Sequence, residues 1–346
     1  MLKTKFYIAL CLFGLVCVAC QPKGTLSITD DTAGFSIDIQ ENITALTIHS
    51  PWKKGEVMQQ FSFSQPYERI VCTSATHIGF INELGMKDKV VGVCTPELIY
   101  SLCQEEWKHI ANIGNDVQLN LEALVLCRPD IVILSSYGQG DDRAQQIEAL
   151  GIPVVYCYEW TEHTPLARAE WIRMFGAVLG CLPKADSVFA SVKEAYEQLK
   201  VDSLKFRSRS IMSGMSWRGT WYVPAGGTFM GRLFRDAGVS YKYEENPSTS
   251  SIPLTMEQAL QDFSQADIWV GCDANSLDEL AAIDKKHTWF KAYEVNQVYN
   301  FRRRCLPSGA NDFWESGVVH PERILQDIQS IIKSDTNAFY YVNALQ

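Results

Sequence analysis

The sequence lacks the short motifs by which most enzyme classes are recognised. It contains no G-x-S-x-G, Walker A, G-x-G-x-x-G or H-E-x-x-H pattern, which are the signatures of many hydrolases, phosphate-loop proteins, dinucleotide-dependent enzymes and zinc proteases. Histidine is scarce as well: there are six in 346 residues, and none has a partner at metal-ligand spacing. We therefore expect a protein that is not an enzyme and has neither a cofactor nor a resident metal ion.

Cysteine is present, but not in the arrangement of a zinc site. Eight cysteines follow residue 20, and no two of them form a C-x-x-C pair. An even number permits disulfides in an oxidising compartment. Cys72, Cys127 and Cys157 lie within apolar runs, however, and equally fit the interpretation of small core residues.

The first residues are typical of an export signal rather than of a folded domain. Lys3 and Lys5 precede an apolar run over residues 6–18, which is too short for a comfortable transmembrane helix. The run ends in C-V-A-C, which resembles the bacterial lipobox except that a cysteine stands where leucine is usual. We expect residues 1–19 to be removed and Cys20 to be lipidated; the alternative is an ordinary signal peptide cleaved nearby.

Basic residues are outnumbered by acidic ones. Lysine and arginine total 31 against 40 aspartates and glutamates, so the formal charge is −9, and loss of the two lysines in residues 1–19 makes it −11. Nucleic acid requires a basic surface, so it is excluded as a partner. The roughly 325 residues that follow the signal exceed what one core usually serves. We expect two lobes, each with its own core.

Residues 20–65 predict a β-rich extension ahead of the main fold. Apolar and polar residues alternate over 35–39 and again over 46–49, which is the pattern of half-buried antiparallel strands. The role of this extension is open at this point.

From residue 66 the pattern changes to short apolar strands separated by helices. Strands are expected at 69–72, 90–93, 131–134 and 153–156. Thr73 or Ser74 can cap one helix and Asn120 another. This alternation predicts a parallel sheet covered on both faces. We assign residues 66–164 to an N-terminal α/β lobe.

The second half repeats this pattern after a helical connection. Residues 165–200 predict one long helical stretch interrupted only at 180–183, followed by a C-terminal α/β lobe over 201–335 and a tail at 336–346. Glu122 and Glu257 lie 135 residues apart, each two places after a capping residue and ahead of a short helix and a buried strand. The fold class is therefore α/β, with two doubly wound lobes joined by a long helix.

In their order and spacing, these segments resemble the helical-backbone class of periplasmic binding proteins, which serve ABC importers of siderophore-bound iron, haem and cobalamin. The resemblance covers about residues 67–333 and leaves residues 21–65 outside. It implies two lobes, a cleft between them and a rigid spanning helix. The segments that carry it are Arg69-Ile70-Val71, Val90-Val91-Gly92-Val93, Asn120-Leu121-Glu122-Ala123-Leu124, Arg128-Pro129-Asp130, Gly151-Ile152-Pro153-Val154, Phe175-Gly176 and His320-Pro321-Glu322-Arg323-Ile324-Leu325.

The resemblance also implies a role for Glu122 and Glu257. In the family, one surface glutamate on each lobe pairs with arginines of the importer, and these two positions match that pattern. Two charged contacts would set the orientation of docking. The alternative is purely structural, because the helix dipole alone favours an acid in the first turn of a helix.

Aromatic and arginine side chains follow several predicted strands, where a doubly wound sheet opens its binding crevice. Rings supply contact area and guanidinium groups pair with carboxylates, so both suit a large planar or anionic chelate. The alternative is that the tryptophans pack the interface between the lobes. The candidate ligand contacts are Trp217, Arg218, Tyr137, Trp314, Arg304 and Trp160.

Together these features predict a monomeric, exported binding protein, periplasmic and lipid-anchored to a membrane. It is expected to capture an iron chelate of the siderophore type and deliver it to the permease and ATPase of an ABC importer. Cobalamin and haem are alternative ligands in the same role. Two alternatives belong to other functional classes: a secreted α/β enzyme, and a sensor lipoprotein that works without a permease.

Overall fold

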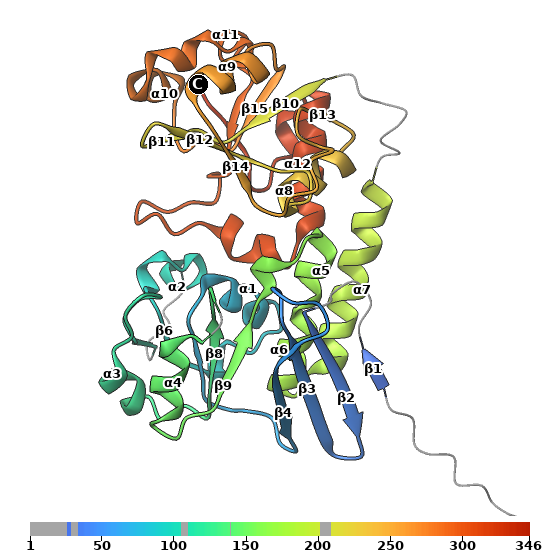
Figure 1. Cartoon of the computed structure of the whole chain (residues 1–346), viewed down its shortest axis with the longest axis vertical. Coiled ribbons are helices and arrows are strands. Elements are labelled where there is room, and N and C mark those ends of the chain that lie inside the picture. Colours follow the sequence, from blue (N-terminus) through green and yellow to red (C-terminus); the bar gives the residue numbers. More distant parts are fainter. Residues whose placement is uncertain (1–25, 29–33, 105–109, 139, 201–208) are drawn as a thin grey trace, which may run out of the picture.

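Two lobes are stacked along the long axis of the molecule, with one long helix beside them (Figure 1). The structure is a computed structural model that describes residues 26–28, 34–104, 110–138, 140–200 and 209–346. The expected signal segment 1–19 and the expected lipidation site Cys20 lie outside the described residues. Across the described part of the chain, no helix is both long enough and apolar enough to cross a bilayer.

The N-terminal lobe is built on a parallel sheet with the strand order β7-β6-β5-β8-β9. Because helices cover both faces of this sheet, β8 is buried at every position. The strands expected from the sequence are confirmed. The elements are β5 (Ile70–Cys72), α1 (Ala75–Glu83), η1 (Lys87–Lys89), β6 (Val90–Val93), η2 (Pro96–Leu98), α2 (Tyr100–Gln104), β7 (Ala111–Asn112), α3 (Leu121–Leu126), β8 (Ile131–Ser135), α4 (Asp142–Glu148) and β9 (Val154–Cys157).

Local sequence fixes where these helices begin. The Ser74 side chain accepts a hydrogen bond from the Thr76 amide at the start of α1, and Asn120 accepts one from the Ala123 amide at the start of α3. Each cap satisfies a backbone N–H that has no partner within the helix. Ser74, rather than Thr73, is therefore the cap of α1.

The N-terminal extension forms an antiparallel sheet, as predicted, in the order β1-β2-β3-β4. It is attached to the N-terminal lobe at β9: the Gln59 side-chain amide donates to the Val154 carbonyl at 2.6 Å and accepts from the Tyr156 amide at 3.2 Å. The extension is thus an integral wall of this lobe. Its strands are β1 (Leu26–Ile28), β2 (Phe35–Gln40), β3 (Ile43–His49) and β4 (Val57–Phe63).

The C-terminal lobe contains a mainly parallel sheet in the order β13-β10-β15-β16-β17, in which only β17 is antiparallel to its neighbour. Residues 221–223, an apolar segment near the start of this lobe, do not belong to the parallel sheet. They lie in β12, which forms a separate antiparallel sheet with β11 and β14, because a tight turn at Arg218 and Gly219 folds the chain straight back. The strands are β10 (Ser210–Ser213), β11 (Ser216–Trp217), β12 (Thr220–Pro224), β13 (Ser240–Tyr241), β14 (Ser251–Leu254), β15 (Ile268–Val270), β16 (Val298–Asn300) and β17 (Asn343–Ala344).

The helices of the C-terminal lobe cover these sheets. Helix α9 starts with a capping box, in which the Thr255 and Gln258 side chains each accept from the other residue's backbone amide. The helical elements are α8 (Phe229–Asp236), α9 (Met256–Phe263), α10 (Leu277–Ile283), η4 (Lys285–Trp289), α11 (Lys291–Glu294), η5 (Asp312–Trp314), η6 (Ser316–Val318), α12 (Pro321–Lys333) and η7 (Thr336–Ala338).

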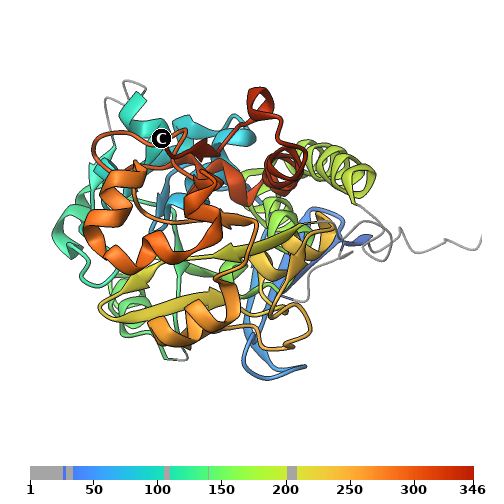
Figure 2. The ribbon, with the colours of Figure 1, turned by 90° about the horizontal axis from the view of Figure 1, so that it is seen from above.

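The connection between the lobes consists of three helices: α5 (Pro165–Glu170), α6 (Ile172–Leu179) and α7 (Leu182–Leu199). The sequence predicts one stretch interrupted only at 180–183, but a further interruption occurs at Trp171. The indole of Trp171 is fully buried, donates to Glu162 at 2.9 Å and packs against Phe35 of the extension. Helix α7 lies along one side of both lobes (Figures 1 and 2).

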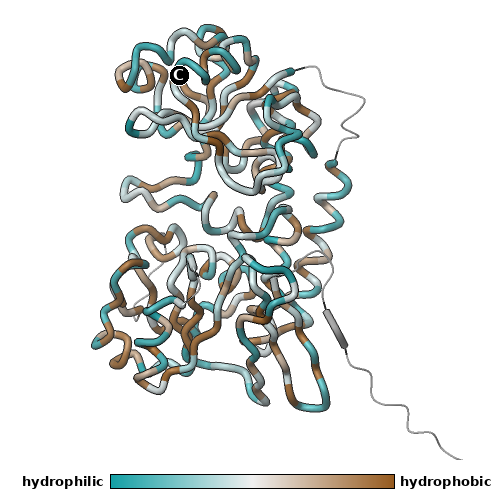
Figure 3. The backbone as a smooth tube through the Cα atoms, viewed as in Figure 1, coloured by the Kyte–Doolittle hydropathy of each residue, from teal (hydrophilic) through white to brown (hydrophobic). Residues whose placement is uncertain are grey.

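The two lobes do not have separate cores, contrary to the expectation from chain length. One buried apolar cluster extends from the N-terminal sheet through the connecting helices to the C-terminal sheet, and a smaller cluster lies on the other face of the N-terminal sheet. Figure 3 shows apolar segments inside both lobes. Buried side chains of α6, α7 and α12 join the two regions, because these helices pack against one another. The lobes are therefore braced by packing as well as by chain connectivity.

Five of the eight cysteines that follow residue 20 are buried core residues, and none of the eight forms a cross-link. All eight that follow residue 20 are free, so the disulfides that the sequence permits are not formed. Cys72, Cys127 and Cys157 are buried, as their apolar surroundings predict.

Candidate ligand site between the lobes

A cavity of about 500 Å³ lies between the two lobes. Small-molecule sites commonly have volumes of roughly 300–1,000 Å³ and lie at such interfaces. One wall comes from the N-terminal lobe and its extension: Pro51, Trp52, Trp160, Thr161, Glu162 and His163. The other comes from the C-terminal lobe: Pro224, Thr228, Phe229, Met230, Thr249, Ser250 and Ser251.

The fold explains why these residues meet. The 3-10 turn η3 (Glu159–Thr161) follows the carboxyl end of β9, and the carboxyl ends of parallel strands open at a common edge of the sheet. On the opposite wall, α8 begins at Thr228, whose hydroxyl accepts from the Gly231 amide. The tight turn before α8 passes against the backbone of residues 243–248 and leaves no room for a side chain at Gly226 or Gly227. The first turn of α8 therefore faces the cavity.

Tyr137 and Trp160, two of the predicted contacts, form an aromatic pair on the N-terminal side. Their ring centroids are 5.6 Å apart. The Trp160 indole donates to the Ser136 carbonyl at 3.2 Å, which holds the ring in place while 40% of the residue stays exposed. Burial of the phenol raises the pKa of Tyr137, so its hydroxyl stays protonated at neutral pH. The two rings are tilted by 42° to each other, and the pair offers exposed aromatic surface with a phenol hydrogen-bond donor.

Trp217 and Arg218 lie apart from this pair, at the tip of the β11–β12 hairpin. Trp217 is 64% exposed, and the Arg218 guanidinium lies 5.5 Å from the centroid of its ring. Arg218 has a positive φ of 51°, which the turn with Gly219 requires. Among the described residues Arg218 makes no ion pair. Neither residue belongs to the wall of the cavity.

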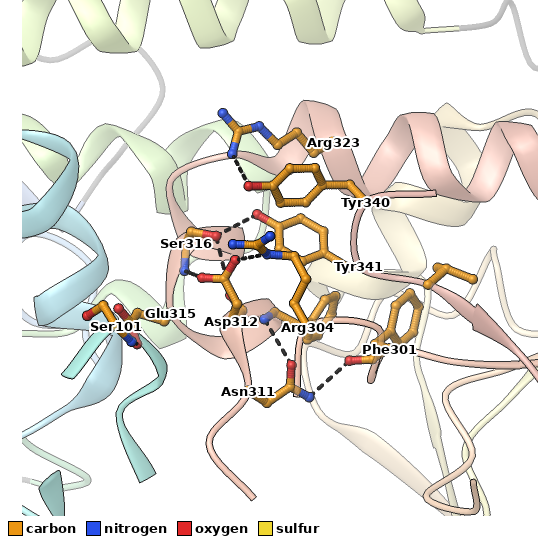
Figure 4. A network of polar contacts seen from close by, with 12 residues as sticks. Ser101, Phe301, Arg304, Asn311, Asp312, Glu315, Ser316, Arg323, Tyr340 and Tyr341 are labelled. Carbon is orange, nitrogen blue, oxygen red and sulfur yellow. Dashed lines mark hydrogen bonds and ion pairs between the residues drawn. The ribbon is translucent and has the colours of Figure 1, made fainter. Parts of the chain in front are cut away.

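Arg304 is already engaged within the protein. Its Nε donates to Asp312 Oδ2 at 2.5 Å, and its guanidinium lies 4.8 Å from the centroid of the Tyr340 ring (Figure 4). The same guanidinium lies 5.2 Å from the centroid of the Tyr100 ring. Tyr100 belongs to the N-terminal lobe, so Arg304 connects the lobes. Its charge is balanced before any ligand arrives. Trp314, the other predicted contact in this segment, is 59% exposed and packs on Phe313.

Other arginines near the cleft are paired in the same way. Arg143 makes a 2.5 Å ion pair with Asp141. Burial opposes ionisation of Asp141, but hydrogen bonds from Arg143 and Ser136 outweigh it and lower the pKa of this carboxyl. Arg168 lies 3.5 Å from Glu159 and 5.3 Å from the centroid of the Phe229 ring. These arginines are therefore paired within the protein, and none of them belongs to the wall of the cavity.

The cavity includes side chains that the sequence did not single out. Trp52 is 42% exposed, and its ring centroid lies 5.3 Å from that of Tyr158. Phe229 and Met230 form the first turn of α8 opposite it. The Pro51-Trp52 break in a strand pattern is a weak sequence signal of a turn. The pairing of the extension with β9, which brings Trp52 to the cleft, was not visible in the sequence.

The two predicted docking residues are exposed, one on each lobe. Glu122 lies in the first turn of α3 and Glu257 in the first turn of α9. Hydrogen bonding from its own backbone amide and from Lys286, whose Nζ is 3.4 Å away, lowers the pKa of Glu257. Both carboxylates are accessible to a partner.

Two α/β lobes, a stiff helical connection and a ligand-sized cavity between them define a solute-binding protein. The chain belongs to the periplasmic binding protein family, whose sequence profile matches residues 70–304. The curated relative MJ0878 of Methanocaldococcus jannaschii, described as an uncharacterized lipoprotein, is 21% identical over 299 residues, which are 81% of this chain and 69% of that protein.

Solved structures share most of the fold at low sequence identity. A periplasmic binding protein from Veillonella parvula superposes with a TM-score of 0.62 at 13% identity, covering 82% of this chain and 96% of that one. The catecholate-siderophore binding protein VctP of Vibrio cholerae gives 0.60 at 13% identity, covering 83% and 99%. The vitamin B12 binding protein BtuF of the same organism gives 0.56 at 14% identity, covering 79% and 99%.

Proposed function

We propose that this protein is the ligand-capturing component of an ABC importer and that it binds a metal chelate of the siderophore type between its lobes. The observation that carries the proposal is the 500 Å³ interlobe cavity with Trp52, Trp160 and Phe229 in its walls. Aromatic rings bury large areas with few internal degrees of freedom, which suits a bulky and partly apolar guest. Cobalamin and haem meet the same description and are alternative ligands.

The polar groups of the cavity favour a chelate over a bare cation. Glu162 is the carboxylate in the wall, and it already accepts hydrogen bonds from the Gly34 amide at 3.2 Å and from the Trp171 indole at 2.9 Å. His163 is the histidine of the wall, and a bare transition metal requires several such ligands together. A metal that enters this cavity would therefore arrive with its own ligands.

Delivery would follow from the anchoring and docking residues. Lipidation of Cys20 would hold the exported protein at a membrane, as the lipoprotein relative suggests. Glu122 and Glu257 would contact basic residues of the permease, one on each lobe, with the ATPase on the far side of that membrane. The shared core limits opening of the cleft to modest movements of a monomer.

A secreted enzyme is the rival class, and the structure offers it little support. A nucleophile and a base exposed in the cavity would favour it. Within the described residues, Cys157 has His77 and Glu159 beside it, but all three are buried and none is in the cavity wall. No substrate can reach that thiol in this conformation.

The test is a set of tryptophan-fluorescence titrations with a ferric catecholate, a ferric hydroxamate, haem and cobalamin. We expect saturable one-to-one binding of one of these ligands, weakened about tenfold or more by Trp160→Ala. Trp289→Ala is the matched control, because Trp289 is 55% exposed on η4 and is not in the cavity wall. A dissociation constant above about 100 µM for all four ligands would exclude the proposal.

A further inference from the structure

Three potential metal ligands converge beneath the cleft. His77 lies in the first turn of α1, Cys157 ends β9, and Glu159 begins η3. One ligand atom from each lies within 4.8 Å of the other two. The exposed fractions are 0% for His77 and Cys157 and 1% for Glu159. The trio is therefore separate from the cavity, although Trp160 directly follows it.

The buried side chain of His77 points to a bound ligand, because its ring nitrogens lack partners among the described residues. Neither ring nitrogen has a hydrogen-bond partner of normal geometry, although the ring is fully buried. A neutral imidazole offers a nitrogen lone pair that can bind a metal ion. A buried polar group without a partner is costly, and native proteins seldom retain one without a function.

The spacing of the other two ligands fits a tetrahedral ion. Cys157 Sγ donates to Glu159 Oε2 at 3.6 Å. In a tetrahedral zinc site with Zn–S near 2.3 Å and Zn–O near 2.1 Å, the sulfur and oxygen are also about 3.6 Å apart. Replacement of the thiol proton by a metal ion at this position would leave the two atoms where they are.

The charges match as well. A thiolate and a carboxylate together neutralise a divalent cation, and a neutral imidazole completes a mixed sulfur, nitrogen and oxygen set that suits zinc. Arg168 Nη2 lies 3.5 Å from Glu159 Oε1, the carboxylate oxygen not bonded to Cys157. Such a contact outside the ligand set would orient Glu159.

We propose that His77, Cys157 and Glu159 form a binding site for one Zn²⁺ ion, distinct from the metal of the captured chelate. Binding forms bonds from the ion to the histidine nitrogen, the cysteine sulfur and a glutamate oxygen, and releases the thiol proton to solvent; no electron is transferred. The ion ties α1 to the end of β9 and to η3, and so stiffens the turn that carries Trp160. This departs from the sequence-based expectation of no resident metal.

The experiment uses the purified protein after removal of metal with a chelator. Zn²⁺ is titrated against a chromophoric competitor, and Co²⁺ serves as a spectroscopic probe for a thiolate ligand. We expect one Zn²⁺ per chain, a thiolate-to-cobalt absorption band, and a thermal midpoint that rises with Zn²⁺ concentration. Cys157→Ala should weaken Zn²⁺ binding at least about tenfold and abolish the band.

The matched control is Cys272→Ala, which removes a buried cysteine of the other lobe and should leave Zn²⁺ binding intact. If Cys157→Ala does not fold, Glu159→Gln decides, because it keeps the shape of the side chain and removes the charge. Equal Zn²⁺ affinity in the parent and in a folded Cys157→Ala or Glu159→Gln variant would overturn the site. None of these readouts involves the chelate, so the zinc site and the proposed transport function can fail independently.

Discussion

His320 joins the two lobes through Glu83: its Nε2 lies 3.0 Å from Glu83 Oε2 at the C-terminal end of α1. The other ring nitrogen, Nδ1, lies 2.8 Å from Glu322 Oε1 in the first turn of α12. A protonated imidazole can donate to both carboxylates at once. The two lobes are thus linked by a charged contact on the side of the molecule where α7 runs.

This contact predicts a pH-dependent stability. Burial lowers the pKa of His320, but hydrogen bonds to Glu322 and Glu83 outweigh burial and the nearby Arg323, and the pKa is raised. The hydrogen bond from His320 lowers the pKa of Glu83, with smaller help from Arg323 and Lys184. His320 therefore contributes its full share to the free energy of unfolding below its unfolded pKa of about 6.5, and this share is lost as pH rises through the higher folded pKa. The share contributed by Glu83 is instead lost in acid, as pH falls below the unfolded pKa of about 4.5.

We expect His320→Gln to lower the free energy of unfolding by about 1–3 kcal/mol near pH 6, and by less at pH 9. Urea unfolding across this range measures the difference. His163→Gln, at an exposed histidine, should follow the parent profile. A His320→Gln deficit that stays constant from pH 6 to pH 9 would contradict the charged contact.

A second prediction concerns Glu315, a buried carboxyl in the C-terminal lobe that accepts from the Ser101 amide of the N-terminal lobe at 3.2 Å (Figure 4). Burial raises the pKa of Glu315 to about 7, although hydrogen bonds from Ser101 oppose the rise. The pKa of Glu315 is thus higher in the folded than in the unfolded protein. Between about pH 4.5 and 7 the unfolded chain ionises more readily, so this residue lowers the free energy of unfolding as pH rises.

Glu315→Gln keeps the acceptor and removes this cost. We expect the variant to gain stability relative to the parent as pH increases from 5 to 8, measured by the thermal midpoint. Glu148→Gln, at an exposed position on α4, should show no such trend. A gain that is the same at pH 5 and pH 8 would show that Glu315 ionises normally.

Close packing between the lobes predicts a large effect of one methyl group. A Cβ at Gly79 of α1 would lie 2.7 Å from the carbonyl carbon of Glu315, so the backbone of one lobe must move. We expect Gly79→Ala to cost about 1–3 kcal/mol in chemical denaturation. Gly138→Ala, where the added Cβ meets nothing within 4 Å, should change stability by less than about 0.5 kcal/mol. Equal effects of the two substitutions would argue against this packing.

The docking proposal predicts a separation of binding from transport. Combined Glu122→Lys and Glu257→Lys should leave ligand affinity unchanged, since both residues are remote from the cavity wall, and reduce uptake by cells at least about tenfold. A purely structural role in the first turn of each helix would instead lower stability slightly and spare uptake. Glu148→Lys is the surface control. Unchanged uptake by the double variant would favour the sensor alternative over an importer component.

The sequence by itself determined the class of the fold and much of its local structure. Apolar runs bounded by caps and turns placed the buried strands, and Asn120 and Thr255 marked the helices that carry the two exposed glutamates. Hydrogen bonds and packing between near neighbours in the chain decide such features, so a local pattern is enough to predict them.

Only the tertiary structure decided which distant side chains meet. Arg304 is paired with Asp312 and lies against rings from both lobes, the extension supplies Trp52 to the cavity, and His77 lies beside Cys157 across 80 residues of chain. Each of these contacts depends on the order of strands in a sheet or on the packing of one lobe against the other. Chain order does not fix those arrangements, because the same local pattern of strands and helices is compatible with several ways of pairing them.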